Sequence, residues 1–155
     1  MQYWLVKTEP DVYSIDDLAR EKKTLWTGVR NYQARNFLRA MKRDDAVLIY
    51  HSNAEPPGVV GIAEVRTEDK PDPTQFDPKS EYFDSKATKE EPRWFCPELS
   101  IVRKLARQVP LEELRRNTSL SGFILLQKGS RLRVIPVSDK HFRAIIAMGS
   151  GSTRR

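Results

Sequence analysis

The sequence predicts an α+β fold, a small mixed barrel of short strands with short helices near both ends of the chain. The length of 155 residues suits one domain, which can bury about 70% of the surface that its unfolded chain would expose. Short apolar or alternating runs, typical of strands, recur along the chain, and helix caps followed by helical spacing occur early and late. We therefore expect a single domain over residues 1–148 and a disordered tail over residues 149–155.

The expected strands are the segments whose apolar residues alternate or form a short buried run. They cover residues 3–8, 46–50, 59–65, 94–109 and 132–137. The second and third flank a proline-containing turn and predict a hairpin, in which Gly61 indicates a bulge or a close approach by another group. In the fourth, Leu99, Ile101 and Val102 are expected to face inward. Residues 123–126 fit a helix or a strand equally well.

The expected helices begin at residues that suit the first turn of a helix. Ser14, Asn31 and Ser138 are the predicted caps of three of them, and Pro110 starts a short helix over residues 110–116. In the helix after Asn31, one apolar stripe has the spacing i, i+3, i+4 and i+7, formed by Ala34, Phe37, Leu38 and Met41. Residues 68–91 are rich in proline and acids and predict a long extended excursion within the domain.

Basic residues are concentrated in one window of the sequence. Residues 20–43 contain eight Lys or Arg against Glu21 alone, a net charge of +7, whereas the whole chain carries +6. Arg30 and the free N–H groups of the helix that follows it would converge where an anion could bind. With an isoelectric point near 9.5, the window predicts a surface for a polyanion, although residues 39, 42 and 43 also fit a solvated helix face.

The composition also limits the location of the chain. No run approaches the roughly 20 apolar residues that span a bilayer, so no membrane partner is expected. Lys7 and Glu9 interrupt the apolar run near the N-terminus, which does not fit a secretory signal. Cys96 is the only cysteine, which excludes an internal disulfide and favours a reducing compartment. The expected location is the cytoplasm, or the nucleus in a eukaryote.

Groups that could catalyse a reaction are sparse. His51 and His141 are the only histidines, and a structural zinc site needs four close ligands, so neither a metal nor another cofactor is expected. His51 and Ser52 would point to opposite faces of a strand, so they cannot act together as base and nucleophile. The sequence also lacks the glycine-rich phosphate loops and the nucleophile motif of hydrolases. We therefore expect a binding protein rather than an enzyme.

The segment that begins at Trp26 is typical of a pocket for a flat ring beside a phosphate. Trp26 could stack on a base, an interaction worth about 1–3 kcal/mol, and Gly28 would let the backbone approach a ligand closely. Arg30, Asn31 and Arg35 supply donors to a phosphate or to base edges. The alternative is that Trp26 is an ordinary core residue.

Four segments of the sequence strongly resemble the EVE domain family. They are residues 4–10 (Trp-Leu-Val-Lys-Thr-Glu-Pro), 26–36 (Trp-Thr-Gly-Val-Arg-Asn-Tyr-Gln-Ala-Arg-Asn), 50–53 and 58–64. The resemblance extends over about residues 2–148 and implies a PUA-like fold, a twisted and partly closed β-barrel flanked by short helices. EVE domains are similar to YTH domains, which hold a methylated base in an aromatic cage, and are associated with modified bases in DNA or RNA.

The resemblance and the local chemistry together define an expected site. The base-binding pocket would comprise Lys7, Thr8, Glu9, Trp26, Thr27, Gly28, Asn31, Tyr32, Ser52 and Asn53. The expected phosphate-binding residues are Arg30, Arg35 and Arg39. By analogy Trp26 forms one wall of the cage, and the second aromatic is open between Tyr32, Tyr50, Tyr82 and Trp94.

The function favoured by the sequence is a non-catalytic module that recognises a modified nucleobase, such as a methylated or hydroxymethylated cytosine, in DNA or RNA. One alternative is a small hydrolase or nucleotide-processing enzyme on the same fold, which would depend on Glu9 or Lys7 in the pocket. Another is a non-specific polyanion binder, whose affinity would fall steeply with salt and ignore the base. We expect a monomer or a weak dimer.

Overall fold

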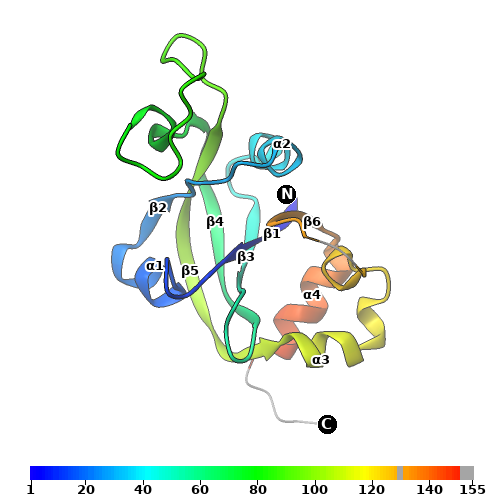
Figure 1. Cartoon of the computed structure of the whole chain (residues 1–155). Coiled ribbons are helices and arrows are strands. Elements are labelled where there is room, and N and C mark those ends of the chain that lie inside the picture. The colour runs from blue at the N-terminus through cyan, green and yellow to red at the C-terminus, as the bar shows by residue number, and fades with distance from the viewer. Residues whose placement is uncertain (129–130, 151–155) are drawn as a thin grey trace.

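A single sheet forms the centre of the fold. The computed structural model describes residues 1–128 and 131–150, and its six strands lie in the order β2-β5-β4-β3-β1-β6 (Figure 1). They are β1 Tyr3–Thr8, β2 Lys23–Leu25, β3 Ala46–His51, β4 Gly58–Pro71, β5 Phe95–Pro110 and β6 Val134–Val137. Neighbouring strands are antiparallel except β1 and β3, which are parallel and are connected through α1, β2 and α2.

The sheet is open. Its two edge strands, β2 and β6, do not pair with each other in the described part of the chain. The predicted mixture of strands and helices is therefore confirmed, but the expected closure into a barrel is wrong. Closure requires the two edge strands to pair. Here β2 has only three residues and pairs with β5, and β6 has four and pairs with β1 at the other end of the strand order.

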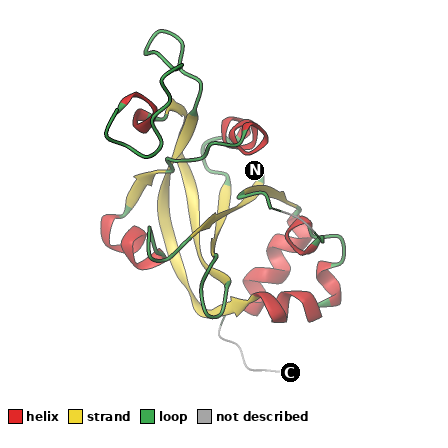
Figure 2. Cartoon of the chain, viewed as in Figure 1, coloured by secondary structure: helices red, strands yellow, loops and turns green. Residues whose placement is uncertain are grey.

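Helices cover both faces of this sheet and create two apolar cores. α1 (Ile15–Glu21) and α2 (Tyr32–Ala40) contribute to one core, and α3 (Leu111–Arg116) and α4 (Asp139–Met148) to the other. Figure 2 shows α3 and α4 grouped together, apart from α1 and α2. Along β1, Trp4 and Val6 belong to the first core and Leu5 to the second. Burial on both faces explains why β3 is a continuous apolar run.

The predicted helix caps are confirmed. The Ser14 side chain accepts a hydrogen bond from the Asp17 backbone N–H, and the Asp17 carboxylate accepts one from Ser14 N–H, which completes a capping box. Asn31 caps α2 and Ser138 caps α4 through their side-chain oxygens. Because the cap of α2 fixes where that helix begins, it also fixes the course of the loop that precedes it.

Gly61 marks both an irregularity and a close approach, as predicted. The β3–β4 hairpin forms, and the register of β4 against β5 shifts between Val59 and Gly61. A Cβ atom on Gly61 would lie 2.4 Å from Cδ1 of Ile15 in α1. The missing side chain therefore lets α1 pack directly on the sheet.

Several element boundaries differ from the sequence prediction. β2 was not predicted, because three residues of mixed polarity carry no strand period. Val102 is 46% exposed, so its predicted inward orientation is wrong, and residues 124–126 form a short 3₁₀ helix. Of the predicted tail, residues 151–155 lie outside the described residues, while Gly149 follows α4 and its N–H donates to the carbonyl of Ile145.

None of the described helices has the length and apolar character needed to cross a membrane.

Candidate functional site

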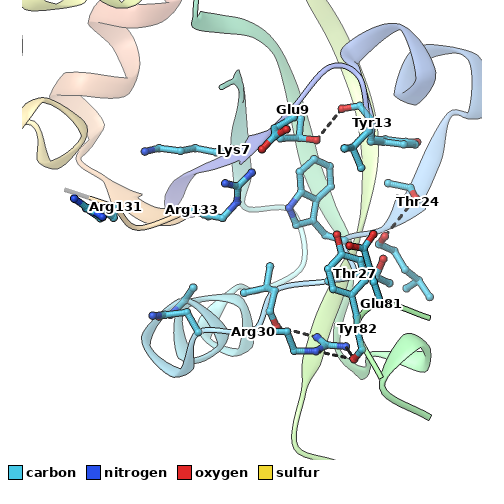
Figure 3. A pocket seen from close by; sticks show the side chains of 18 residues that line it. Lys7, Glu9, Tyr13, Thr24, Thr27, Arg30, Glu81, Tyr82, Arg131 and Arg133 are labelled. Atoms are coloured by element: carbon cyan, nitrogen blue, oxygen red, sulfur yellow. Dashed lines mark hydrogen bonds between the residues drawn. The ribbon is translucent and has the colours of Figure 1, made fainter. Parts of the chain in front are cut away.

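A pocket of about 750 Å³ lies where four segments of the chain meet. They are the end of β1 with the loop after it, β2 with the loop that leads to α2, residues 81 and 82 of the excursion, and residues 131 and 133 just before β6 (Figure 3). The segments are distant in sequence. The pairing of β1 with β6 brings the first and the last of them together.

Trp26 belongs to both the pocket and the core. Its side chain lines the pocket but is only 7% exposed, within the core that α1 and α2 cover. The rings of Tyr13 and Trp26 meet edge to face, with centroids 6.1 Å apart and planes at 88°. The two interpretations of Trp26 from the sequence, core residue and pocket residue, are therefore compatible.

Tyr13 is fixed beside Trp26 by the loop that follows β1. The Thr8 hydroxyl donates to the Tyr13 carbonyl at 2.8 Å, and the Tyr13 hydroxyl donates to the Glu21 carboxylate at 2.6 Å. Burial and this hydrogen bond to Glu21 raise the pKa of Tyr13 to about 12. Tyr13 is therefore a neutral aromatic wall at physiological pH.

Gly28 lies beneath the ring of Tyr82. Its φ of +89° favours glycine, and a Cβ atom there would lie 2.9 Å from atoms of the Tyr82 ring. Gly28 N–H donates to the carboxylate of Asp72 at 2.8 Å. We find that the absent side chain makes room for Tyr82, a protein group, where the sequence suggested room for a ligand.

Arg30 links the loop between β2 and α2, which we call the pocket loop, to the excursion. Its guanidinium donates to Asp72 at 3.1 Å, to the Tyr82 carbonyl at 2.8 Å and to the Thr74 hydroxyl at 3.0 Å (Figure 3 shows the bonds to Tyr82). Asp72 is 1% exposed, so this ion pair is largely shielded from water. The side chain of Arg30 thus positions Tyr82 over the pocket.

Gln75 completes the attachment of the excursion. It is fully buried, its amide N–H₂ donates to the carbonyls of Asp72 and Trp94, and its oxygen accepts from the backbone N–H groups of Arg93 and Trp94. A short 3₁₀ helix, Pro73–Phe76, carries it. The excursion is therefore attached by buried hydrogen bonds, and one wall of the pocket depends on it.

Most of the residues that the sequence assigned to the pocket do line it. They are Lys7, Thr8, Glu9, Trp26, Thr27, Gly28 and Asn31, and Arg30 lines it as well. Of the aromatic residues considered for the second wall, Tyr82 lines the pocket, while Tyr32, Tyr50 and Trp94 do not.

Three predicted pocket residues lie outside its lining. Tyr32 begins α2 and stacks on Trp94, with ring centroids 4.9 Å apart. Asn53 donates to the Glu9 carboxylate at 3.0 Å and so supports a lining residue from behind. Ser52 donates its backbone N–H to the Thr8 carbonyl, and its buried hydroxyl has no hydrogen-bond partner among the described residues.

Other lining residues were missed by the sequence reasoning. The polar and aromatic ones are Tyr13, Thr24, Glu81, Arg131 and Arg133. Tyr13 could have been found, because it follows closely on residues 4–10, which carry the family resemblance. Arg131 and Arg133 carry no local signal, since only the pairing of β6 with β1 brings them to the pocket.

The predicted phosphate-binding residues on α2 have partners within the protein. Arg39 donates to both carboxylate oxygens of Asp69, at 2.9 and 3.2 Å, and its guanidinium carbon lies 3.8 Å from the centroid of the Phe95 ring. Arg35 donates to the Arg93 carbonyl at 2.9 Å and lies over the Tyr32 ring. Neither side chain lines the pocket.

The site contains one lysine in an unusual environment. Burial, and secondarily the charge of Arg133, lower the pKa of Lys7 from its ordinary value. Its ammonium nitrogen lies 5.8 Å from the centroid of the Tyr50 ring. Over residues 1–128 and 131–150, no group of three or more His, Cys, Asp or Glu side chains could hold a metal ion.

The geometry defines a small mixed α/β domain whose pocket combines aromatic walls with a cationic border. The family model for the EVE domain matches residues 2–148, and the chain belongs to the EVE domain family. Thymocyte nuclear protein 1 from Mus musculus is 38% identical over 165 residues, which cover 94% of this chain and 73% of the relative. The family prediction from the sequence is thus confirmed.

Solved structures agree with this assignment. A protein from Pseudomonas syringae is 45% identical, with a TM-score of 0.91, over 94% of this chain and 98% of that one. Human THYN1 protein, in complex with DNA that contains 5-methylcytosine, is 33% identical, with a TM-score of 0.90, over 98% of this chain and 99% of that one. A member of the same fold and family therefore binds modified DNA.

Proposed function

We propose that this protein binds DNA that contains 5-methylcytosine and holds the modified base in the pocket beside Trp26. The observation that carries the proposal is the pocket itself, with aromatic and polar walls, in a chain that shares its fold and family with a protein seen in complex with 5-methylcytosine DNA. Pockets for small ligands usually measure about 300–1,000 Å³ and combine apolar walls with a few polar groups. This one meets both conditions.

The walls suit a flat base with a methyl group. Trp26, Tyr82 and Tyr13 all line the pocket: Tyr82 lies against Gly28, and Tyr13 meets Trp26 edge to face. Aromatic stacking binds any base, so selection requires hydrogen bonds to base edges, for which Thr27 and Asn31 line the pocket. A base in a duplex must first be flipped out of the stack, at a cost of a few kcal/mol, so single strands are the easier ligands.

The test measures binding of single-stranded DNA with one 5-methylcytosine against its unmodified twin. Trp26→Leu keeps an apolar side chain in the core but removes the flat ring, and Phe37→Leu is the matched control. Phe37 packs against the same core but does not line the pocket. We expect the wild type and Phe37→Leu to prefer the methylated strand about tenfold, roughly 1.4 kcal/mol, and Trp26→Leu to lose the preference.

Circular dichroism at the assay temperature establishes that both variants are folded. Equal, strongly salt-dependent binding of both strands by the wild type would reject the proposal and leave a non-specific polyanion binder. Retention of the preference by folded Trp26→Leu would remove Trp26 from the site. A panel with 5-hydroxymethylcytosine and the corresponding RNA strands then defines the range of modifications and carriers.

One observation supports an enzymatic alternative. Lys7, with its lowered pKa, and Glu9 line the same pocket, and a lysine that loses its proton easily can act as a nucleophile or base. This alternative requires turnover of a modified nucleoside that disappears in Lys7→Met or Glu9→Gln. We favour the non-catalytic function because human THYN1 protein, which shares the fold and the family, forms a complex with DNA that contains 5-methylcytosine.

A further inference from the structure

Three cations border the pocket on one side. Lys7, Arg131 and Arg133 all line it, and Figure 3 shows them together on the side away from Arg30 and Tyr82. No ion pair within 4.0 Å joins any of the three to a carboxylate among the described residues. Arg39 of α2 differs from these three, since it is paired with Asp69. We call Lys7, Arg131 and Arg133 the rim cations.

Two of the rim cations lie opposite each other across a strand pair. β1 and β6 are antiparallel with Val6 opposite Val134, and the Lys7 N–H donates to the Arg133 carbonyl at 2.9 Å, which continues the register by one position. Side chains directly opposite on an antiparallel pair have Cβ atoms about 4.5–5.5 Å apart, and like charges there are destabilising. The lowered pKa of Lys7, due to burial first and then to Arg133, agrees with this repulsion.

The acids near the rim do not relieve the repulsion. Glu9 and Glu81 also line the pocket, but neither forms an ion pair with a rim cation, and the Glu9 carboxylate accepts a hydrogen bond from Asn53. The Tyr50 ring is the neighbour of the Lys7 ammonium group, and it is uncharged at neutral pH, since a tyrosine has an ordinary pKa of about 10 and burial raises the pKa of Tyr50 further. A bound anion would therefore gain attraction from two or three cations and remove an unfavourable arrangement.

We propose that the rim cations form the phosphate-binding site of the protein and hold the backbone phosphate beside the nucleotide whose base occupies the pocket. This inference rests on the proposed function. The rim cations then take the place of the α2 residues Arg35 and Arg39 as the principal phosphate ligands. The two parts of the site then have different roles. The aromatic walls select the base, whereas the rim cations bind the backbone without regard to sequence.

The experiment measures the affinity for the methylated and unmodified single strands as a function of salt. The variants are Arg133→Met and Lys7→Met, and Arg116→Met is the control that removes the same charge from an exposed site on α3. Each contact to a single-strand phosphate contributes about −0.7 to the slope of log K against log[salt]. We expect Arg133→Met and Lys7→Met to lower the affinity for both strands by roughly the same factor, about three- to tenfold at low salt, and to reduce the slope by about 0.7.

The preference for the methylated strand should remain in Arg133→Met, because the aromatic walls and the polar residues Thr27 and Asn31 are unchanged. If Arg133→Met and Lys7→Met lose no more affinity or slope than Arg116→Met, the rim cations do not bind phosphate and this inference is rejected, while a persisting preference still supports the proposed function. If the wild type shows no preference for the methylated base, the proposed function fails whatever the rim variants do. Thermal unfolding adds a readout: relief of like-charge repulsion predicts that Arg133→Met is at least as stable as the wild type.

Discussion

The two groups of basic side chains around the pocket differ in their partners. The arginines of the pocket loop and α2 are bonded within the protein: Arg30 to Asp72 and two other acceptors, Arg35 to a backbone carbonyl, and Arg39 to Asp69. The rim cations Lys7 and Arg133 are close to each other and have no acidic partner in the described part of the chain. The first group is engaged within the protein, and the second is the group that we propose for the phosphate.

This difference shows that the local charge of a sequence does not measure the charge of a surface. The window 20–43 carries +7, but acids that follow much later in the sequence, Asp69 and Asp72, fold back against its arginines. Lys7 comes from a segment with no excess of basic residues, and Arg131 and Arg133 follow more than 100 residues after Lys7 in the sequence. Charges must therefore be assigned to partners before a binding surface is inferred.

The largest effect is expected from Asp72→Ala. It leaves Arg30 without its carboxylate and removes the acceptors of the Gly28 and Thr74 backbone N–H groups. Removing one partner of a buried pair costs about 3–5 kcal/mol. Because Arg30 retains some exposure, we expect the free energy of unfolding, measured with urea, to fall by about 3 kcal/mol. The control is Asp69→Ala, which breaks the exposed pair with Arg39 and should cost less than about 1 kcal/mol. Equal losses would contradict the distinction between an internal and a surface arginine.

A smaller effect is expected from Gly28→Ala. The new Cβ atom would meet the Tyr82 ring at 2.9 Å, and the backbone has a φ of +89° that an L side chain rarely adopts. The control Gly122→Ala has a similar φ, +83°, but open space around the added atom. The backbone conformation alone costs about 1–2 kcal/mol, so Gly122→Ala reports that part and any excess in Gly28→Ala reports the contact with Tyr82. A displaced Tyr82 should also weaken base binding; unchanged binding would show that Tyr82 is not a wall of the site.

The sequence predicted most of the fold because its signals are local. Ser14, Asn31 and Ser138 were correctly identified as caps, and the hairpin with its irregularity at Gly61 formed as expected. The failures concern long-range pairing. Barrel closure and the short β2 strand depend on which edges of the sheet meet, and neither leaves a periodic pattern in a few residues.

The same limit applies to the site. The lining residues at positions 7–9, 26–28 and 31 were assigned to the pocket from the sequence, because they lie within segments that resemble the family. Tyr32 lies outside the lining and stacks on Trp94 from the first turn of α2, and Ser52 and Asn53 bond to the end of β1 and the residue after it. Arg133 could be found only from the register of β6 against β1. Residues from neighbouring strands complete the site, and sequence periodicity does not reveal which strands are neighbours.

His51 offers a further basic side chain with an internal partner. Ile15 N–H donates to its Nε2 atom at 3.1 Å, which requires that nitrogen to be unprotonated. Burial lowers the pKa of His51, against the opposing influence of Asp16. The unfolded chain, with an ordinary pKa of about 6.5, therefore takes up a proton first, and stability should fall as the pH decreases below about 6.5. Urea unfolding between about pH 7.5 and 5.5 tests this; His51→Gln should show a flatter profile, and an unchanged profile would assign the pH dependence to other groups.

The smallest effect is expected from Arg39→Met, which completes the comparison of the two groups. Because Arg39 is paired with Asp69 and lies outside the pocket, its removal should change the affinity for single-stranded DNA less than twofold and the salt slope by well under 0.7, the value of one phosphate contact. The exposed pair should contribute only about 0.2–1 kcal/mol to stability. Arg133→Met, measured in the same titrations, is the contrasting variant with an equal change of charge. A loss of affinity in Arg39→Met as large as in Arg133→Met would show that the pair with Asp69 opens for DNA, and the basic face of α2 would then join the rim cations as part of the interface.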